Sequence, residues 1–346
     1  LVPVVAAVLG LLVLGPLWRG AIMSTLIAIV MSLSFVVLTG FAGQASLAQT
    51  AFAGIAGFGL SKLAMQYDVP FPLAPIAAAV IAAVVGLVLG LPALRLRGTN
   101  LAIVTLAGGV AVAEFVFKNP MFVGDITTGG AKVPNPELFG WDFGLIVGSN
   151  SSRPIFGIFL VAVVLILALA VSNLRRSGTG RRMLAIRSNE RAAAASGLSV
   201  SRVKMLAFGM SAFIAGSAGC LIAYRFGAVS EMSFGMFASL SALAVAYLGG
   251  ITSVSGAVTA GIVTTAGVAF FGMTQIVGSL GPWGTMIGGV LLIFTAIQNP
   301  EGIAGAIRTG AQEARAKKAR AAAAEASASS TDADAASQRP PATVIV

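Results

Sequence analysis

Few residues in this chain have the types and spacing that covalent chemistry needs. Its 346 residues include no His, which argues against a metal cluster or His-based acid–base catalysis. The single Cys220 lies in an apolar run and is expected to be a small packing residue. We find no paired carboxylates, no nucleophile elbow and no G-x-x-x-x-G-K-S/T phosphate loop. We therefore expect neither an enzyme nor an ATPase, and no cofactor or metal bound by this chain.

The remaining chemistry is non-covalent, and its first candidates are polar side chains inside apolar runs. Irregular backbone at membrane depth is tolerated only against protein or a water-filled cavity, and the stretch 40–59 is rich in Gly and Ala. Close helix packing would explain most of its glycines but explains its glutamines less well. Glu114 lies near the end of its run and could simply reach outward to solvent. The candidate pathway residues are Gln44, Ser46, Gln49, Asn100, Thr105 and Glu114.

The second candidate is a long basic segment between two apolar runs, residues 175–204. Its eight basic residues stand against one acid, Glu190, so its net charge is +7, compared with +10 for the whole chain. Because Lys and Arg resist translocation, this segment is expected on the cytoplasmic face. No aromatic residues accompany the charges, so nucleic-acid binding is not indicated.

A short helix with marked ends is predicted inside the basic segment. Asn189 can cap its first turn, and Glu190 suits the positive end of the helix dipole. Four alanines continue it, and Gly197 can adopt the left-handed conformation that ends a helix. A small rigid helix between two spans is suited to a groove on a partner. The alternative is a solvated loop whose arginines touch anionic lipid.

These candidates must be positioned by membrane helices. The chain is 57% hydrophobic and 10% charged, with a mean hydropathy of +0.94, which is typical of a membrane protein. We expect an all-α transmembrane domain over residues 1–308 and a disordered Ala/Ser-rich cytoplasmic tail over 309–346. The first run is expected to be a span rather than a cleaved signal. About ten spans are predicted, at 2–18, 21–39, 44–64, 72–93, 99–117, 154–173, 203–224, 236–250, 254–272 and 283–298.

The loops agree with this order of spans. The loop 118–153 has no net charge and is expected on the side opposite the basic segment. With ten spans both termini would be cytoplasmic. Whether 44–64 crosses fully or re-enters is left open. Small-residue seams for helix packing are predicted at Gly86 with Gly90 and at Ser211, Ala215 and Gly219.

The chain resembles the LivM type of permease, a membrane subunit of the branched-chain amino acid ABC importer. The resemblance covers about residues 40 to 302. It depends on five segments in the family's order: GFAGQASLAQTAFAGIAGF, LRGTNLAIVTL, GRRMLAIRSNERAAAASGLSVSRVKMLAF, SFGMFASLSALAVAYLGGITSVSGAV and NPEGI. It implies a polytopic fold of the LivH/LivM/ribose-permease type.

The resemblance also implies a mechanism. This chain would pair with a second permease subunit of LivH type in the bacterial inner membrane. Two ABC ATPase subunits would dock beneath the pair and hydrolyse ATP, and an extracytoplasmic binding protein would deliver the substrate. The short helix would be the coupling helix that the ATPases push. The matching coupling residues are Arg187, Asn189, Glu190, Arg191, Ala193 and Gly197.

Two departures from the family affect the expected cargo. Val110 stands where the family usually carries a glutamate, with Glu114 one turn later. The family's outer Thr-Gly-Gly-x-Asn-Gly becomes TGGAKV, in which Thr128, Gly129 and Gly130 are the candidate outer-loop site. Urea, amides or another small polar solute are therefore alternatives to branched-chain amino acids. An ion-coupled secondary carrier is less favoured, because ionisable groups near the midplane are scarce.

Overall fold

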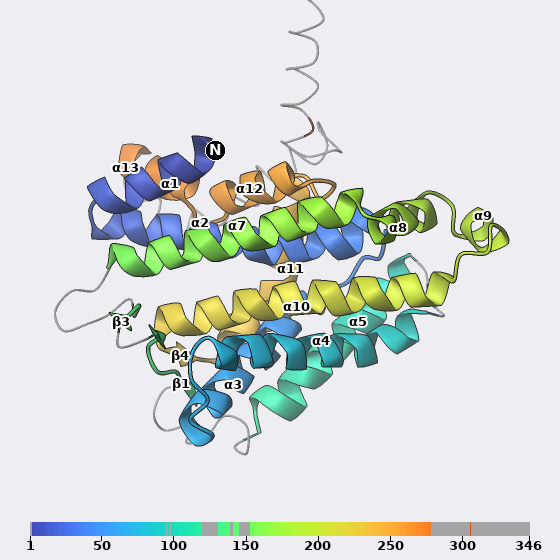
Figure 1. The fold of residues 1–346 in the computed structure, drawn as a ribbon, viewed down its shortest axis with the longest axis horizontal. Helices are drawn as coiled ribbons and strands as arrows, with labels where there is room; N and C mark the ends of the chain where they lie inside the picture. The colour runs from blue at the N-terminus through green and yellow to red at the C-terminus, as the bar shows by residue number, and fades with distance from the viewer. Residues whose placement is uncertain are drawn as a thin grey trace, which may run out of the picture.

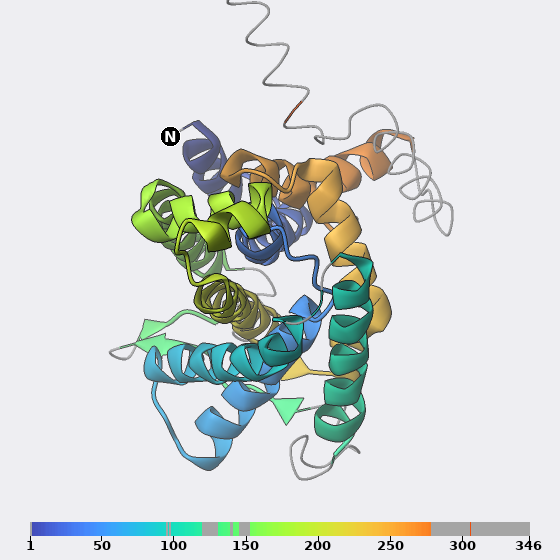
Figure 2. The ribbon, with the colours of Figure 1, turned by 90° about the vertical axis from the view of Figure 1, so that its right-hand side faces the viewer.

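The computed structural model describes residues 2–94, 96, 98–119, 131–138, 141–144, 153–277 and 305. Most of its long helices run roughly side by side in Figure 1, with α8 and α9 at one end and short strands at the other. Figure 2, turned by 90°, looks along several of these helices from the end that carries α8 and α9. In the described part, seven helical segments are long and apolar enough to cross a membrane.

The N-terminal run is divided into two helices, α1 (Val2–Val13) and α2 (Pro16–Phe35). The predicted boundary at residues 18–20 was wrong, because the break comes earlier, at Leu14 and Gly15. Proline suits the first turn of a helix, where its missing N–H costs nothing. The π-helix η1 (Val36–Phe41) continues α2. The combined segment is apolar all round and almost entirely buried, which makes it the central helix of the bundle.

Three further helices pack closely through small residues on one side of α2. A Cβ built on Gly219 would lie only 1.9 Å from the carbonyl oxygen of Ala53, and one on Gly86 would lie 2.3 Å from the Cβ of Ala212. Both predicted small-residue seams are therefore confirmed as helix contacts. The helices are α3 (Gln49–Gln66), α4 (Leu73–Ala93) and α10 (Val200–Phe226).

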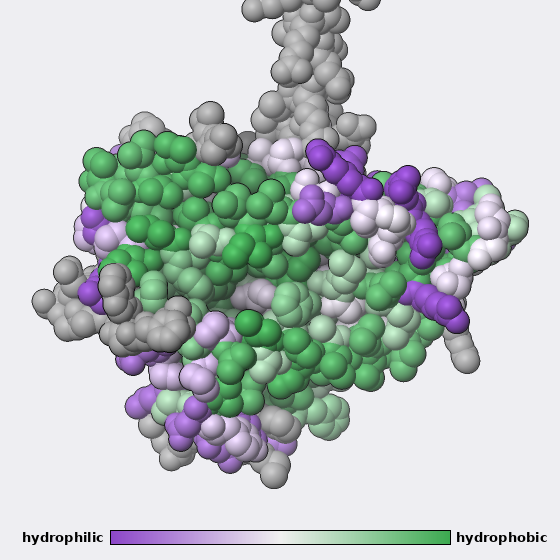
Figure 3. All heavy atoms as spheres, viewed as in Figure 1, coloured by the Kyte–Doolittle hydropathy of each residue, from purple (hydrophilic) through white to green (hydrophobic). Residues whose placement is uncertain are grey.

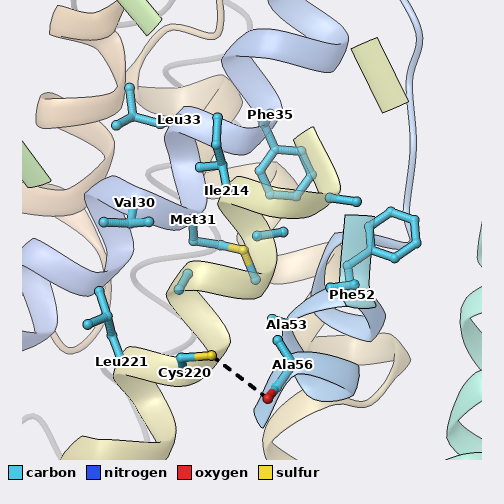
Figure 4. Close-up of a cluster of buried hydrophobic side chains, with 14 of the residues drawn as sticks. Val30, Met31, Leu33, Phe35, Phe52, Ala53, Ala56, Ile214, Cys220 and Leu221 are labelled. Carbon is cyan, nitrogen blue, oxygen red and sulfur yellow. Dashed lines mark hydrogen bonds between the residues drawn. The ribbon is translucent and has the colours of Figure 1, made fainter. Parts of the chain in front are cut away.

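The core between these helices is shown in Figure 4, where side chains of α2, α3 and α10 meet. Phe35 and Phe52 are fully buried. Cys220 is buried as well, and its thiol lies 3.8 Å from the carbonyl oxygen of Ala56. The prediction that Cys220 is a packing residue is thus confirmed.

Short strands lie at the end of the bundle away from α9 (Figure 1), and the described residues form four of them, each two residues long. They pair as two antiparallel ribbons, β1 with β4 and β2 with β3. The bounds of these strands are Ala131–Lys132, Glu137–Leu138, Trp141–Asp142 and Ala228–Val229. The helices on either side of the loop 118–153 are α5 (Thr99–Val112), its π-helical extension η2 (Ala113–Phe117) and α7 (Pro154–Arg176).

The predicted span 254–272 is not one continuous helix. A turn in which Gly267 N donates to Thr264 O at 2.7 Å divides it, and Val268 N then donates to Thr25 Oγ1 at 3.0 Å. The helix that begins at Val268 therefore has its first backbone N–H bonded to a side-chain hydroxyl of α2. The last predicted span, 283–298, and the tail 309–346 lie outside the described residues. The elements here are η4 (Glu231–Phe234), α11 (Met236–Gly249), α12 (Val254–Val263) and α13 (Val268–Val277).

Apolar side chains cover much of the outside of the bundle. Figure 3 shows a mostly hydrophobic face over α7, α10 and α4, with hydrophilic residues gathered toward the two ends of these helices. Val88 of α4 and Ile166 of α7 are more than half exposed, as expected for side chains that meet lipid rather than water. The chain is a multi-pass helical membrane protein.

Candidate functional site

An irregular segment, Ala42–Ala48, follows η1 and precedes α3, so the stretch 44–64 is only partly helical. Other helices hold the backbone of this segment. The hydroxyl of Thr105 on α5 accepts a hydrogen bond from Leu47 N at 3.1 Å, and the hydroxyl of Ser239 on α11 donates to Leu47 O. Unwound backbone inside a membrane bundle needs such partners.

Two glutamines of this region keep a buried acceptor without a hydrogen bond in the described structure. Gln49 Nε2 donates to Ser211 Oγ at 2.8 Å, and Ser211 Oγ donates to the carbonyl oxygen of Ser34 at 2.9 Å. The Oε1 atoms of Gln44 and Gln49 have no partner. An unmade hydrogen bond at a buried group costs about 1–3 kcal/mol. Each of these two oxygens is therefore a buried acceptor with unused hydrogen-bonding capacity.

The other predicted pathway residues lie in different surroundings. Ser46 is buried, and its hydroxyl accepts from Ala48 N at 3.2 Å, so it orders the irregular segment itself. Asn100 is exposed in the first turn of α5. Glu114 lies in η2, 2.7 Å from Lys118 Nζ. The structure therefore brings Thr105 to the irregular segment and leaves Asn100 and Glu114 apart from it.

The pair at the far end of α5 is a surface ion pair. The hydrogen bond that Lys118 donates to Glu114 raises the pKa of Lys118 above its ordinary value, and Glu231 lies 3.6 Å from the same ammonium. All three side chains are largely exposed, and such pairs contribute little to stability. This arrangement agrees with the interpretation of Glu114 as a side chain that reaches outward.

The basic segment folds into two helices rather than one. α8 (Gly178–Ser188) follows α7 almost directly and is capped by Ser177, whose hydroxyl accepts from Gly180 N at 3.2 Å. The predicted short helix is present as α9 (Glu190–Ala195). Sequence analysis missed α8, although Ser177 before a glycine-rich turn is a capping signal.

The ends of α9 lie where they were predicted. Asn189 Oδ1 accepts from the backbone N–H groups of Arg191 and Ala192, each at 3.1 Å. Gly197 has φ +81°, the left-handed conformation that ends the helix. Ala193 is the buried contact of α9 with the rest of the chain. Arg191 is exposed on its outer surface.

A buried ion pair fastens α9 to α10. Lys204 Nζ lies 2.9 Å from Glu190 Oε1, and the Lys204 side chain is 1% exposed. Lys204 makes no other polar contact in the described structure. Sequence analysis counted Lys204 among the basic residues but did not connect it to Glu190. Their spacing of fourteen residues carries no local pairing signal.

Arg187 of α8 joins the basic segment 175–204 to the backbone around the irregular segment. Its guanidinium donates from Nη1 to the carbonyl oxygen of Gly40 at the end of η1. The aliphatic part of the Arg187 side chain lies over Gly43. A Cβ added at Gly43 would lie 3.0 Å from Arg187 Cγ, and the φ angle of Gly43 is +68°. A cleft of about 430 Å³ separates the two segments beyond this contact, lined by Ala42–Gln44, Gly98 and Ile186–Arg191. The predicted pathway residue Gln44 and the predicted coupling residues Arg187 and Asn189–Arg191 therefore line the same cleft.

Some predicted residues lie outside the described part of the chain. These are the outer-loop residues Thr128, Gly129 and Gly130. Among the described residues no group of three or more His, Cys, Asp or Glu side chains could hold a metal ion.

Comparison with known proteins places these features in a family. The family model for the permease component of the branched-chain amino acid transport system matches residues 17–296. The high-affinity branched-chain amino acid transport system permease protein LivM of Salmonella typhimurium strain LT2 is 37% identical over 243 residues, 65% of this chain and 57% of that protein. Its Escherichia coli K12 counterpart is 38% identical over the same shares.

A more distant relative transports a sugar. The xylose transport system permease protein XylH of Haemophilus influenzae is 37% identical over 108 residues, 31% of this chain and 28% of that protein. The chain spans just over half the length of the two LivM relatives. No solved structure matches it.

Proposed function

The chain belongs to the family of permease components of the branched-chain amino acid transport system, and on that premise we propose that it is the permease subunit of an ATP-binding cassette importer. Its cargo would be branched-chain or related amino acids, as the names of the LivM relatives indicate. It is a transport subunit, and in this proposal ATP is hydrolysed by partner subunits.

The observation that carries the proposal is the contact that Arg187 of the basic segment makes with Gly40 at the end of η1 and with Gly43 of the irregular segment. α9 is capped at both ends, and the Glu190–Lys204 ion pair fastens it to the start of α10. A force applied to α9 would therefore reach α10 and, through Arg187, the backbone of Gly40. Since π-helices such as η1 often occur at functional sites, the end of η1 is a suitable place for the pathway to open and close.

The partners follow from this arrangement. Two ABC ATPase subunits would receive α9 on the cytoplasmic face, where the basic segment is expected to lie. A second permease of LivH type would complete the pathway in the bacterial inner membrane, and both termini would be cytoplasmic. An extracytoplasmic binding protein would dock at the opposite end, near the loop that contains Thr128, Gly129 and Gly130.

The irregular segment supports an amino acid as cargo. The unpartnered Oε1 atoms of Gln44 and Gln49 are acceptors, and an α-ammonium group offers three donors for them. The same acceptors would also suit urea or a sugar hydroxyl, so the side chain of the cargo must be determined by experiment.

The test is reconstitution of the full chain with its ATPases, its second permease and its binding protein in proteoliposomes. Uptake of leucine, isoleucine, valine, urea and xylose is measured with ATP inside the vesicles, and again with an ion gradient in place of ATP. We expect ATP-dependent uptake of at least one branched-chain amino acid. Uptake driven by the gradient alone would show an ion-coupled carrier instead and would overturn the proposal.

A further inference from the structure

An apolar groove opens between α4, α7 and α10 on the hydrophobic face shown in Figure 3. Its volume is about 380 Å³. Ile166 and Leu169 of α7 and Leu206 of α10 are at least half exposed along its rim or beside it. The side chains that line the groove are all apolar and include Leu87, Leu167, Val171, Leu174, Leu206 and Phe213.

Two arginines flank the end of this groove that lies toward α8 and α9. Arg175 follows the groove residue Val171 by four positions on α7, and Arg202 precedes the groove residue Leu206 by four on α10. Residues four apart lie on the same helix face, one turn from each other. Both arginines are exposed, and no described carboxylate pairs with either of them.

We propose that this groove binds an anionic phospholipid of the leaflet that faces α8 and α9. The phosphate would lie between Arg175 and Arg202, because the planar guanidinium matches phosphate geometry with paired hydrogen bonds. One acyl chain would lie in the groove below it. A ligand of this kind explains the apolar lining and the two unpaired cations together.

The dimensions of the groove fit an acyl chain. On α10 the lining extends from Leu206 to Ile214, which is about 12 Å at ~1.5 Å per residue. Half of a bilayer core is about 15 Å thick.

The experiment measures phospholipid retained by the purified full chain in mild detergent after extraction from nanodiscs. The nanodiscs contain equal amounts of phosphatidylglycerol and phosphatidylcholine, and native mass spectrometry detects the bound lipid. We expect wild-type protein to retain phosphatidylglycerol preferentially. The double variant Arg175→Gln/Arg202→Gln should reduce that preference about 30-fold, since each basic residue contributes about fivefold.

Two matched controls separate the groove from general charge. Arg181→Gln/Arg191→Gln removes the same charge from exposed positions outside the groove and should leave the preference unchanged. Ala170→Trp fills the groove and should reduce retention of both lipids. Ala162→Trp, an exposed position on α7 outside the lining, should not.

Three results would overturn the proposal. An equal loss of the phosphatidylglycerol preference in both arginine double variants would show that the lipid is attracted by the net charge of the protein and not by a specific site. Equal retention in Ala170→Trp and wild-type protein would show that the acyl chain lies elsewhere. Cross-linking of the Ala170→Cys variant through its thiol to another polypeptide in the assembled complex would show that protein covers the groove.

Discussion

Lys204 Nζ lies 2.9 Å from Glu190 Oε1, and this ion pair connects the first residue of α9 with the second turn of α10. The two partners differ in their surroundings, since the Lys204 side chain is 1% exposed and the Glu190 side chain 21%. Removing one partner is therefore not equivalent to removing the other. The Glu190 carboxylate can turn toward water, whereas the Lys204 ammonium cannot.

We expect Glu190→Ala to lower the free energy of unfolding by about 3–5 kcal/mol, because it leaves a buried cation without a partner. Lys204→Met should cost less, because Glu190 keeps access to water. The double variant Glu190→Ala/Lys204→Met should recover most of the loss. Thermal unfolding of the purified chain measures all three. A double variant as unstable as Glu190→Ala alone would contradict this account.

Arg187→Ala is expected to uncouple ATP hydrolysis from transport. The substitution removes the contact with Gly40 but leaves α9, its caps and its ion pair in place. In the reconstituted complex, ATP hydrolysis should persist while uptake falls at least tenfold. A tenfold fall corresponds to a loss of about 1.4 kcal/mol in the coupling free energy between hydrolysis and transport.

The matched control for Arg187 is Arg181→Ala, which removes an exposed arginine from α8. Arg181 has no contact with the irregular segment in the described structure. Arg181→Ala should therefore preserve the ratio of uptake to hydrolysis. If uptake and hydrolysis fell in the same proportion in Arg187→Ala, Arg187 would act in docking or folding rather than in transmission.

Gln49→Leu should reduce transport without reducing stability. It removes a buried acceptor that has no partner among the described residues, together with the hydrogen bond that Nε2 donates to Ser211, while the Ser211 hydroxyl keeps its hydrogen bond to the Ser34 carbonyl oxygen. We expect an unchanged or higher melting temperature and a several-fold higher KM for uptake. Ser217→Ala, which removes only a hydrogen bond within α10, is the control. Normal uptake kinetics in Gln49→Leu would exclude this amide from the pathway.

Gly219→Ala should separate α3 from α10. The added Cβ would lie 1.9 Å from the Ala53 carbonyl oxygen, and backbone cannot move aside as a side chain can. Overpacking of this kind costs about 1–3 kcal/mol or more. At Gly59 a Cβ would meet only the Cβ of Ala78, at 3.9 Å. Comparing the yield of monodisperse protein and its melting temperature for Gly219→Ala and Gly59→Ala tests this contact.

Local features of this fold could be predicted from the sequence. The apolar runs predicted the long helices, because burial in lipid needs only length and composition. Asn189 and Gly197 predicted the ends of α9, since caps depend on neighbouring residues alone. The boundary between α1 and α2 was predicted wrongly, because Trp18 and Arg19 were taken as a break although Pro16 had already started a helix.

Other features depend on residues far apart in the chain. A hydropathy pattern does not show the turn at Thr264–Gly267, because the hydroxyl that receives the next helix belongs to Thr25, more than two hundred residues earlier. The same holds for the irregular segment, whose backbone is held by α5 and α11.

The sequence by itself determined that this chain is a helical membrane protein with a short capped helix inside a basic segment, because hydropathy, charge and capping act over a few residues. Only the tertiary structure decided that Glu190 pairs with Lys204, that Arg187 reaches Gly40, and that two glutamine oxygens have no partner in the described part of the chain. A hydrogen bond or ion pair requires two groups within a few ångströms. Chain order does not specify that proximity until the helices have packed.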